Sequence, residues 1–196
     1  MKKLFLLLAV VALGFTACDK EKENDNAIIP EVGTLVTKDG VKGVVFYADD
    51  NVTKIVSVEQ TMLSWCIVDG TEATGATDTE DGAKNMATIK SLTDWENRHP
   101  AFKWCDDYGQ GWYLPASTEL EQIYVNREII NATLSVNGFE LLKTDVEPGE
   151  SSWYWSSTEK GVGLVKGAIA RSFAGGGSPI PSSKSAEMYI RAVLAY

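Results

Sequence analysis

The order of predicted secondary-structure segments constrains the fold of this chain more than any other feature. Runs rich in β-branched and aromatic residues, which are typical of strands, lie at 41–47, 55–58, 61–68, 153–158, 164–173 and 188–195. Between the third and fourth runs, apolar residues recur at helical spacing, which predicts helices at 82–89, 100–108 and 119–130. Strands, then helices, then strands indicate an α+β domain with a largely antiparallel sheet.

Turn and capping residues place the ends of several of these segments. The polar stretch 48–51 between the first two runs predicts a hairpin. Asp81 is suited to cap the first helix, and Thr118 with Glu121 forms a capping box at the start of the third. Small and polar residues predict a surface loop at 69–78 and a long irregular loop at 174–185.

The first seventeen residues are set apart from this domain. A cationic start at Lys2 and Lys3 precedes an unbroken apolar run from Leu4 to Leu13, and residues 14–17 then lead to the small residue Ala17 before Cys18. This is the pattern of a secretion signal. The apolar run is shorter than the roughly 20 residues that a membrane-spanning helix needs, so we expect residues 1–17 to be removed.

The residue after this segment suggests a lipid anchor. Phe15-Thr16-Ala17-Cys18 resembles the lipobox of bacterial lipoproteins, in which a diacylglyceryl group alkylates the thiol and the chain is cut just before the Cys. An ordinary signal peptide with an incidental Cys18 is the alternative. The acidic stretch after Cys18 resembles the export signal of Bacteroidetes-type lipoproteins, although a solvated linker explains it equally well. The predicted location is therefore the bacterial outer membrane, with the chain lipid-anchored at the cell surface.

The interpretation as a lipoprotein divides the chain into three parts. Residues 1–17 are the signal peptide, 18–31 are the lipidated Cys and a flexible acidic tether, and 32–196 are the folded domain. The whole chain has 18 Lys and Arg against 27 Asp and Glu, a formal charge of −9, which becomes −11 when Lys2 and Lys3 are removed. A nucleic-acid partner is not expected, because a phosphate-binding face needs an excess of basic residues.

Two cysteines remain in the domain. Cys66 and Cys105 belong to an exported protein, where a disulfide is permitted, and only one intramolecular pairing exists. Two buried free thiols are the alternative. Neither Cys has the partner spacing of a metal site, so no metal or other cofactor is expected.

The sequence offers no recognisable catalytic motif. Its one histidine, His99, directly precedes Pro100, which indicates a residue at a helix boundary. A nucleophile elbow, a P-loop, a dinucleotide fingerprint and a zinc-protease motif are all absent from the sequence. Carboxylates at 78–81 before Gly82 resemble part of a calcium loop, but a capped acidic helix start explains them better. No catalytic residue is predicted.

Aromatic residues are the remaining signal for binding. Trp112, Tyr113, Trp153, Tyr154 and Trp155 have the chemistry of a sugar-stacking platform, because aromatic faces bury apolar ring surface and the indole N–H bonds hydroxyls. The same residues are suited to packing in a hydrophobic core. Strand alternation places Trp153 and Trp155 on one face of the strand and Tyr154 on the other, which favours burial in the core of the side chains on at least one face.

Several sequence blocks resemble a known family. Gly111-Trp112-Tyr113-Leu114-Pro115, Tyr154-Trp155-Ser156-Ser157-Thr158-Glu159, Ile190-Arg191-Ala192-Val193, Asp81-Gly82-Ala83-Lys84-Asn85 and Val45-Phe46-Tyr47-Ala48-Asp49 are similar to blocks of the fibrobacter major paralogous domain family. That family is allied to the C-terminal domain of the Legionella-type collagen-like adhesin. The resemblance covers roughly 33–196. It implies a C-type-lectin-like fold, with two main helices packed on antiparallel sheets, paired termini and a long loop region.

Two departures qualify this resemblance. Ala116 stands where the family has a Ser or Thr helix cap, so with Glu119 retained we expect the cap at Ser117 or Thr118. Glu147-Pro148-Gly149 resembles the Glu-Pro-Asn sugar motif of calcium-dependent lectins, but Gly149 lacks the amide ligand and no Trp-Asn-Asp follows. Calcium-bridged sugar binding is therefore disfavoured.

These observations predict a surface lipoprotein with a lectin-like, adhesin-type domain that binds a glycan or an extracellular protein without catalysis. The expected ligand surface is the loop region 144–152 with 175–185, because recognition tends to lie on loops of a rigid scaffold. The candidate ligand-binding residues are Trp153, Glu147, Gly175, Gly176, Ser178 and Lys184. The alternatives are a structural or accessory subunit of a surface assembly and, less favoured, an enzyme that acts on polysaccharide with two of the acidic residues.

Overall fold

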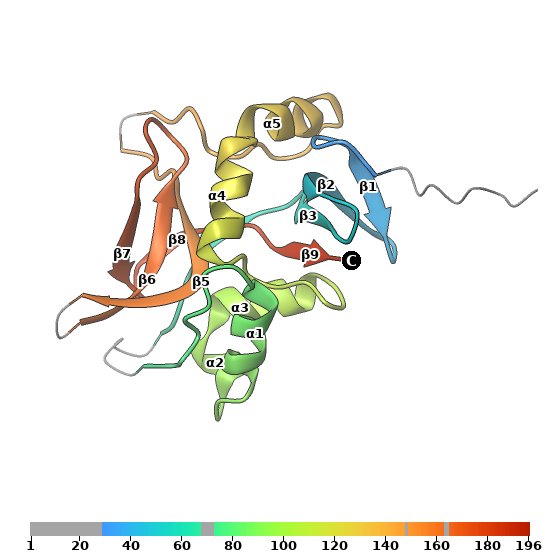
Figure 1. Ribbon diagram of the computed structural model, residues 1–196. Coiled ribbons are helices and arrows are strands. Elements are labelled where there is room, and N and C mark those ends of the chain that lie inside the picture. Colours follow the sequence, from blue (N-terminus) through green and yellow to red (C-terminus); the bar gives the residue numbers. More distant parts are fainter. Residues whose placement is uncertain (1–28, 68–72, 148, 163–164) are drawn as a thin grey trace, which may run out of the picture.

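An α+β fold of two mostly antiparallel sheets and five helices is seen in the computed structural model, which describes residues 29–67, 73–147, 149–162 and 165–196. The predicted signal peptide, Cys18, most of the tether and Pro148 lie outside the described residues. The predicted order of strands, helices and strands is confirmed. Figure 1 shows one sheet on each side of helix α4, with α1, α2 and α3 below it and α5 above it.

Sheet A contains the N-terminal strands and the last strand of the chain. Its members are β1 (Leu35–Lys38), β2 (Val41–Ala48), β3 (Thr53–Ser57) and β9 (Val193–Ala195), in the order β1-β2-β3-β9. The predicted hairpin is confirmed as β2 and β3. In its turn, the Asp49 carboxylate accepts hydrogen bonds from the backbone N–H groups of Asn51 and Val52, as a turn aspartate is expected to do.

Sheet B contains the remaining strands. They are β4 (Thr61–Ser64), β5 (Trp153–Val162), β6 (Val165–Ser172), β7 (Pro179–Ser183) and β8 (Glu187–Ile190), in the order β4-β8-β5-β6-β7. Only the β5–β8 contact is parallel among the described strand pairs. The chain passes between the two sheets twice, from β3 to β4 and from β8 to β9, and these strands pair as β3 with β9 and β4 with β8.

The helices fill the space between and beside the sheets. They are α1 (Gly82–Lys90), α2 (Trp95–Arg98), α3 (Pro100–Tyr108), α4 (Ser117–Val125) and α5 (Arg127–Val136). Helix α4 contacts β2 of sheet A as well as β5 and β6 of sheet B, so it joins the two sheets. Asp81 caps α1 as predicted, because its carboxylate accepts a hydrogen bond from the Lys84 N–H at 3.0 Å.

The long helix predicted at 119–130 is interrupted at Asn126, and five helices form where the resemblance implies two main ones. The side-chain amide of Asn126 donates to the carbonyls of Phe46 and Gln122, both at 3.1 Å. Such bonds offer the chain an alternative to continued helix. The chain therefore turns at Asn126, and α5 packs on β2.

The segment predicted as an irregular loop at 174–185 contains strand β7, so that prediction is wrong over 179–183. Pro179 and Pro181 argue against a strand in the sequence, because proline lacks the N–H that a strand in the interior of a sheet requires. β7 lies at the edge of sheet B and pairs on one side only, with β6. An edge position tolerates both prolines.

Most of the aromatic residues singled out in the sequence belong to the core. Trp112, Tyr113, Tyr154 and Trp155 are buried, and Trp153 is partly buried against the same core. Tyr154 and Trp155 are both fully buried although they point to opposite faces of β5. The prediction of core for at least one face is confirmed, and β5 is covered on both faces at this point.

Candidate functional site

Sequence blocks far apart along the chain meet at one buried carboxylate. The Glu119 side chain is 1% exposed and accepts hydrogen bonds from Lys54 Nζ at 2.7 Å and Tyr113 Oη at 2.9 Å. It also accepts from the backbone N–H groups of Ala116 at 2.9 Å and Gly82 at 3.1 Å. We call these five residues the Glu119 network. It ties α4 to β3 and to the start of α1.

The Glu119 network explains two features of the sequence. A Cβ at Gly82 would lie 2.5 Å from the Leu114 carbonyl oxygen, so only glycine fits at this start of α1. The predicted helix cap at Ser117 or Thr118 is not formed, and the capping box of Thr118 with Glu121 is absent as well. Ala116 is itself the N-cap, and its backbone N–H bonds to Glu119, the only half of a capping box that an alanine permits.

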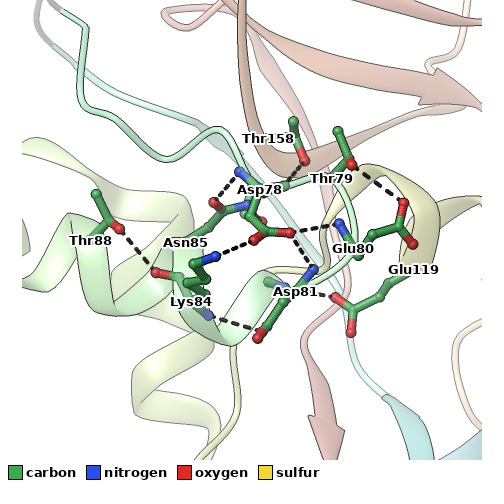
Figure 2. Close-up of polar contacts among 11 residues, drawn as sticks. Asp78, Thr79, Glu80, Asp81, Lys84, Asn85, Thr88, Glu119 and Thr158 are labelled. Carbon is green, nitrogen blue, oxygen red and sulfur yellow. Dashed lines mark hydrogen bonds and ion pairs between the residues drawn. The ribbon is translucent and has the colours of Figure 1, made fainter.

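Asp78 forms a second polar centre beside this network (Figure 2). Its carboxylate accepts from the backbone N–H groups of Glu80 and Asp81 and from Lys84 Nζ at 2.8 Å. Its main-chain groups exchange two hydrogen bonds with the Asn85 side chain, and its carbonyl accepts another from Thr158. The Lys84 hydrogen bond and those two N–H groups lower the pKa of Asp78 to about 2.

The carboxylates at 78–81 therefore bind the protein itself. No group of three or more acidic, His or Cys side chains in the described part of the chain is arranged to hold a metal. The Asp78 loop is also held to β5, because Asn85 donates to Ser157 and Thr158 donates to Asp78. These contacts give the motif residues a structural role.

A buried ion pair joins Lys184 to Glu159. Lys184 is 1% exposed, and its Nζ donates to Glu159 Oε1 and lies 4.5 Å from the centre of the Trp65 ring. Glu159 Oε2 accepts from the backbone N–H groups of Thr74 and Gly75. Burial acts to raise the pKa of Glu159, but the hydrogen bond and charge of Lys184 and these N–H groups outweigh it, so the pKa lies below its ordinary value.

The residues predicted to bind a ligand lie in different environments. Glu147, Gly175, Gly176 and Ser178 are exposed, and Trp153 is partly buried. Ser152, at the end of the first predicted segment, accepts a hydrogen bond from the N–H of Phe173, which lies two residues before the second segment. Lys184 departs from the predicted surface contact, because its charge is buried and paired with Glu159.

The two cysteines are free, and both are buried. Of the two alternatives left open by the sequence, the structure has separate thiols. Burial raises the pKa of Cys105 well above its usual value, which keeps this thiol protonated and unreactive.

His99 lies at the boundary between α2 and α3, as predicted. It is 1% exposed, and its ring makes edge contacts with Trp65 and Phe102. Neither ring nitrogen has a hydrogen-bond partner in the described part of the chain. Burial lowers the pKa of His99 to about 4, and the positive charges of Arg98 and Lys184 act in the same direction.

This environment predicts an acid sensitivity. Because the pKa is lower in the folded chain than the ordinary value of 6.5, the unfolded chain binds the proton more readily. The contribution of His99 to stability should fall by roughly 3 kcal/mol as the pH drops from 6.5 to 4. Urea unfolding of wild type and His99→Phe at both pH values measures it. We expect a smaller loss in the variant, whereas equal losses would contradict the assignment to His99.

A groove with partly exposed aromatic side chains lies between α3 and sheet A. Its cavity of about 520 Å³ is within the range of small-ligand sites. Trp104 and Tyr108, one helical turn apart on α3, line one wall with ring centres 5.3 Å apart. Phe139 lines another part, with Lys42 Nζ 5.5 Å from its ring centre. We call this the aromatic groove.

Polar groups surround the aromatic groove. Glu59 and Asp107 place exposed carboxylates at its lining, and Lys42 supplies an ammonium group. Burial raises the pKa of the Tyr108 phenol, and the Glu59 carboxylate raises it further. The phenol is therefore a hydrogen-bond donor at every physiological pH. Apolar ring faces beside such donors and acceptors suit a ligand that carries both hydroxyls and C–H surface.

Sequence analysis missed this groove. The signal available was Trp104 and Tyr108 at helical spacing in the predicted helix at 100–108. The opposite walls come from residues 40–42, 58–59 and 139, which are distant in sequence from α3. Only the packing of α3 beside sheet A brings them together.

Comparisons with known proteins bear on the fold. No protein-family model matches the chain, and no curated protein matches it. Among solved structures, a fimbrial protein from Bacteroides ovatus is similar, with a TM-score of 0.53 and 17% identity. The match covers 74% of this chain and 36% of the fimbrial protein. At this identity the likeness concerns the fold alone.

None of the helices in the described part of the chain has the length and apolar character required to cross a membrane.

Proposed function

We propose that the chain is a lipid-anchored protein of the bacterial cell surface whose domain binds a glycan in the aromatic groove, without catalysis. The observation that carries this proposal is the group of partly exposed rings of Trp104, Tyr108 and Phe139 in one groove, next to the Glu59 and Asp107 carboxylates. A sugar ring has apolar C–H faces and hydroxyl edges. Stacking on the rings and hydrogen bonding to the carboxylates complement both.

The surface location is supported by two independent features. The predicted signal peptide and Cys18 provide export and an anchor, and the polar stretch that follows provides a tether. The similar solved structure is a fimbrial protein, which fits an adhesin-type role at the cell surface.

The domain itself is proposed to be a C-type-lectin-like member of the fibrobacter major paralogous domain family. In support, β9 returns to the sheet that contains the N-terminal strands, which brings the two ends of the domain into one sheet. Residues of three of its sequence blocks, Gly82, Tyr113 and Ser157, take part in the connected polar contacts of Glu119 and Asn85.

A comparison of two tryptophans tests the location of the site. Trp104→Ala removes a ring of the aromatic groove and should weaken glycan binding by more than about tenfold. Trp153→Ala is the matched control, since Trp153 is also partly buried but belongs to the ligand surface predicted from the loops. A glycan array identifies the ligand with wild type, and calorimetry with that glycan measures both variants.

Each outcome of this experiment is informative. Loss of binding in Trp104→Ala alone supports the aromatic groove, whereas loss in Trp153→Ala alone moves the site to the predicted loop region. Absence of glycan binding by wild type, with other envelope proteins co-purifying, would favour a structural or accessory subunit. Turnover of chromogenic glycosides that is abolished by Glu59→Gln or Asp107→Asn would replace binding with hydrolysis.

A further inference from the structure

A second, smaller cavity lies on sheet B, away from the aromatic groove. It has a volume of about 200 Å³ and is bounded by the first turn of α4 and by one face of β5, β6 and β7. Ile169 and Arg171 of β6 lie opposite Pro181 and Pro179 of β7 in the strand register. Each pair is two residues apart along its strand, so all four side chains share the face that lines the cavity.

The central group of this cavity is the guanidinium of Arg171. Arg171 is 5% exposed, and its Nη1 donates to the Gly177 carbonyl. Its Nε has no hydrogen-bond partner in the part of the chain that the structure describes. Its Nη2 is 3.3 Å from the Glu121 carboxylate, which is longer than the roughly 2.7–2.9 Å of a well-formed charged hydrogen bond.

The Arg171 guanidinium also lies 5.0 Å from the centre of the Tyr124 ring, but the Nε–H remains without a hydrogen-bond partner among the described residues. Glu121 reaches the guanidinium from α4, and the Glu121 side chain is 56% exposed, so this carboxylate is free to move into solvent. A buried guanidinium can donate two parallel hydrogen bonds to one carboxylate, an arrangement that the single contact with Glu121 does not provide. Lys160, exposed on β5, adds a second positive charge at the rim of the same cavity.

The rest of the lining indicates what carries the carboxylate. Pro179, Pro181 and Ile169 offer an apolar surface for C–H groups. Ser117, Thr118 and Thr158 line the other side. Their hydroxyls donate to Thr79, Glu80 and Asp78, which leaves the Ser117 and Thr118 oxygens to accept hydrogen bonds from a ligand. A ligand ring with C–H faces, hydroxyls and one carboxylate is complementary to the apolar residues, the hydroxyl-bearing residues and the guanidinium of this cavity, respectively.

We propose that this cavity binds the carboxylate of an acidic sugar such as a hexuronic acid, with Arg171 and Lys160 as its cationic contacts and Glu121 as a competing carboxylate. The Glu121 side chain occupies the outer side of Arg171 in the absence of ligand and is displaced on binding. The site is separate from the aromatic groove and does not depend on it.

Two single substitutions should change the affinity for glucuronic acid in opposite directions. Lys160→Ala removes a favourable charge and should weaken binding by about two- to fivefold, while Glu121→Gln removes the competitor and should strengthen it by a similar factor. Lys90→Ala, the same charge change on α1, is the matched control. Amide chemical-shift changes of the full chain, titrated with glucuronic acid and in parallel with glucose, measure the affinities and locate the site.

We expect glucuronic acid to shift the amides of β6, β7 and the first turn of α4, and glucose to leave them unchanged. Equal affinities in Lys160→Ala, Glu121→Gln and Lys90→Ala would overturn the proposal, as would shifts confined to the aromatic groove. If a short peptide with a free C-terminal carboxylate binds there and glucuronic acid does not, the site is a protein-terminus site instead. Trp104→Ala should leave glucuronic acid binding unchanged, which separates this test from that of the aromatic groove.

Discussion

Replacing Glu119 with alanine should lower the free energy of unfolding by about 3–5 kcal/mol, the range for breaking a buried charged pair. The change removes the acceptor for four donors at once, of which Lys54 carries a charge and Gly82 and Ala116 contribute buried backbone N–H groups. Urea unfolding monitored by tryptophan fluorescence measures the loss. Glu119→Gln, which retains one acceptor oxygen, should lose less.

The matched control for this prediction is Glu128→Ala. Glu128 is a glutamate in the first turn of α5, as Glu119 is in the first turn of α4, but its side chain is 77% exposed and its contact with Arg127 spans 3.6 Å. We expect its removal to change stability by less than about 1 kcal/mol. Similar losses for Glu119→Ala and Glu128→Ala would show that water replaces the lost acceptor at the network.

Replacing Lys184 with methionine should have a comparable effect, again about 3–5 kcal/mol at neutral pH. Methionine keeps most of the aliphatic length beside Trp65, but the Glu159 carboxylate then remains buried without its cation. Lys103→Met, with an exposed i,i+4 pair to Asp107, is the control and should cost under about 1 kcal/mol. The double variant Lys184→Met/Glu159→Gln should recover part of the loss, because no unpaired charge is left inside.

The pH dependence of the Lys184 variant gives a second check. In wild type the pKa of Glu159 lies below its ordinary value, so its stabilising contribution is present above that value and is lost as the pH falls through the folded pKa. Without Lys184 the buried carboxylate favours its protonated form. The stability difference between wild type and Lys184→Met should therefore shrink as the pH falls from 7 to about 4. A difference independent of pH would contradict this account.

The features that sequence analysis predicted correctly are those set by neighbouring residues. The hairpin of β2 and β3 depends on a polar turn between two β-branched runs, and the start of α1 depends on Asp81 three residues before the N–H that it caps. Both are local patterns. The α+β class follows from the same local patterns, because the observed order of strands, helices and strands is the order that they predict.

The features that were missed depend on partners distant in sequence. Lysine is normally a surface residue, and the burial of Lys184 is tolerable because Glu159, 25 residues away, pairs with its charge. Asn126 ends α4 because its side chain reaches the Phe46 carbonyl, 80 residues away. The aromatic groove has the same origin, since Trp104 and Phe139 meet only after α3 and the chain beyond α5 have packed.

The pairing of early strands with late ones also determines when this chain is able to fold. β3 needs β9 to cover its outer edge, and β4 has β8 as its strand neighbour, with Met62 opposite Tyr189. Neither sheet is complete before β8 and β9 are available, because both strands lie within residues 187–196. Pairings of such long sequence separation also form slowly. In the proposed export under a signal peptide, the chain therefore remains unfolded while it crosses the membrane. It acquires its tertiary structure only once β9 has reached the far side.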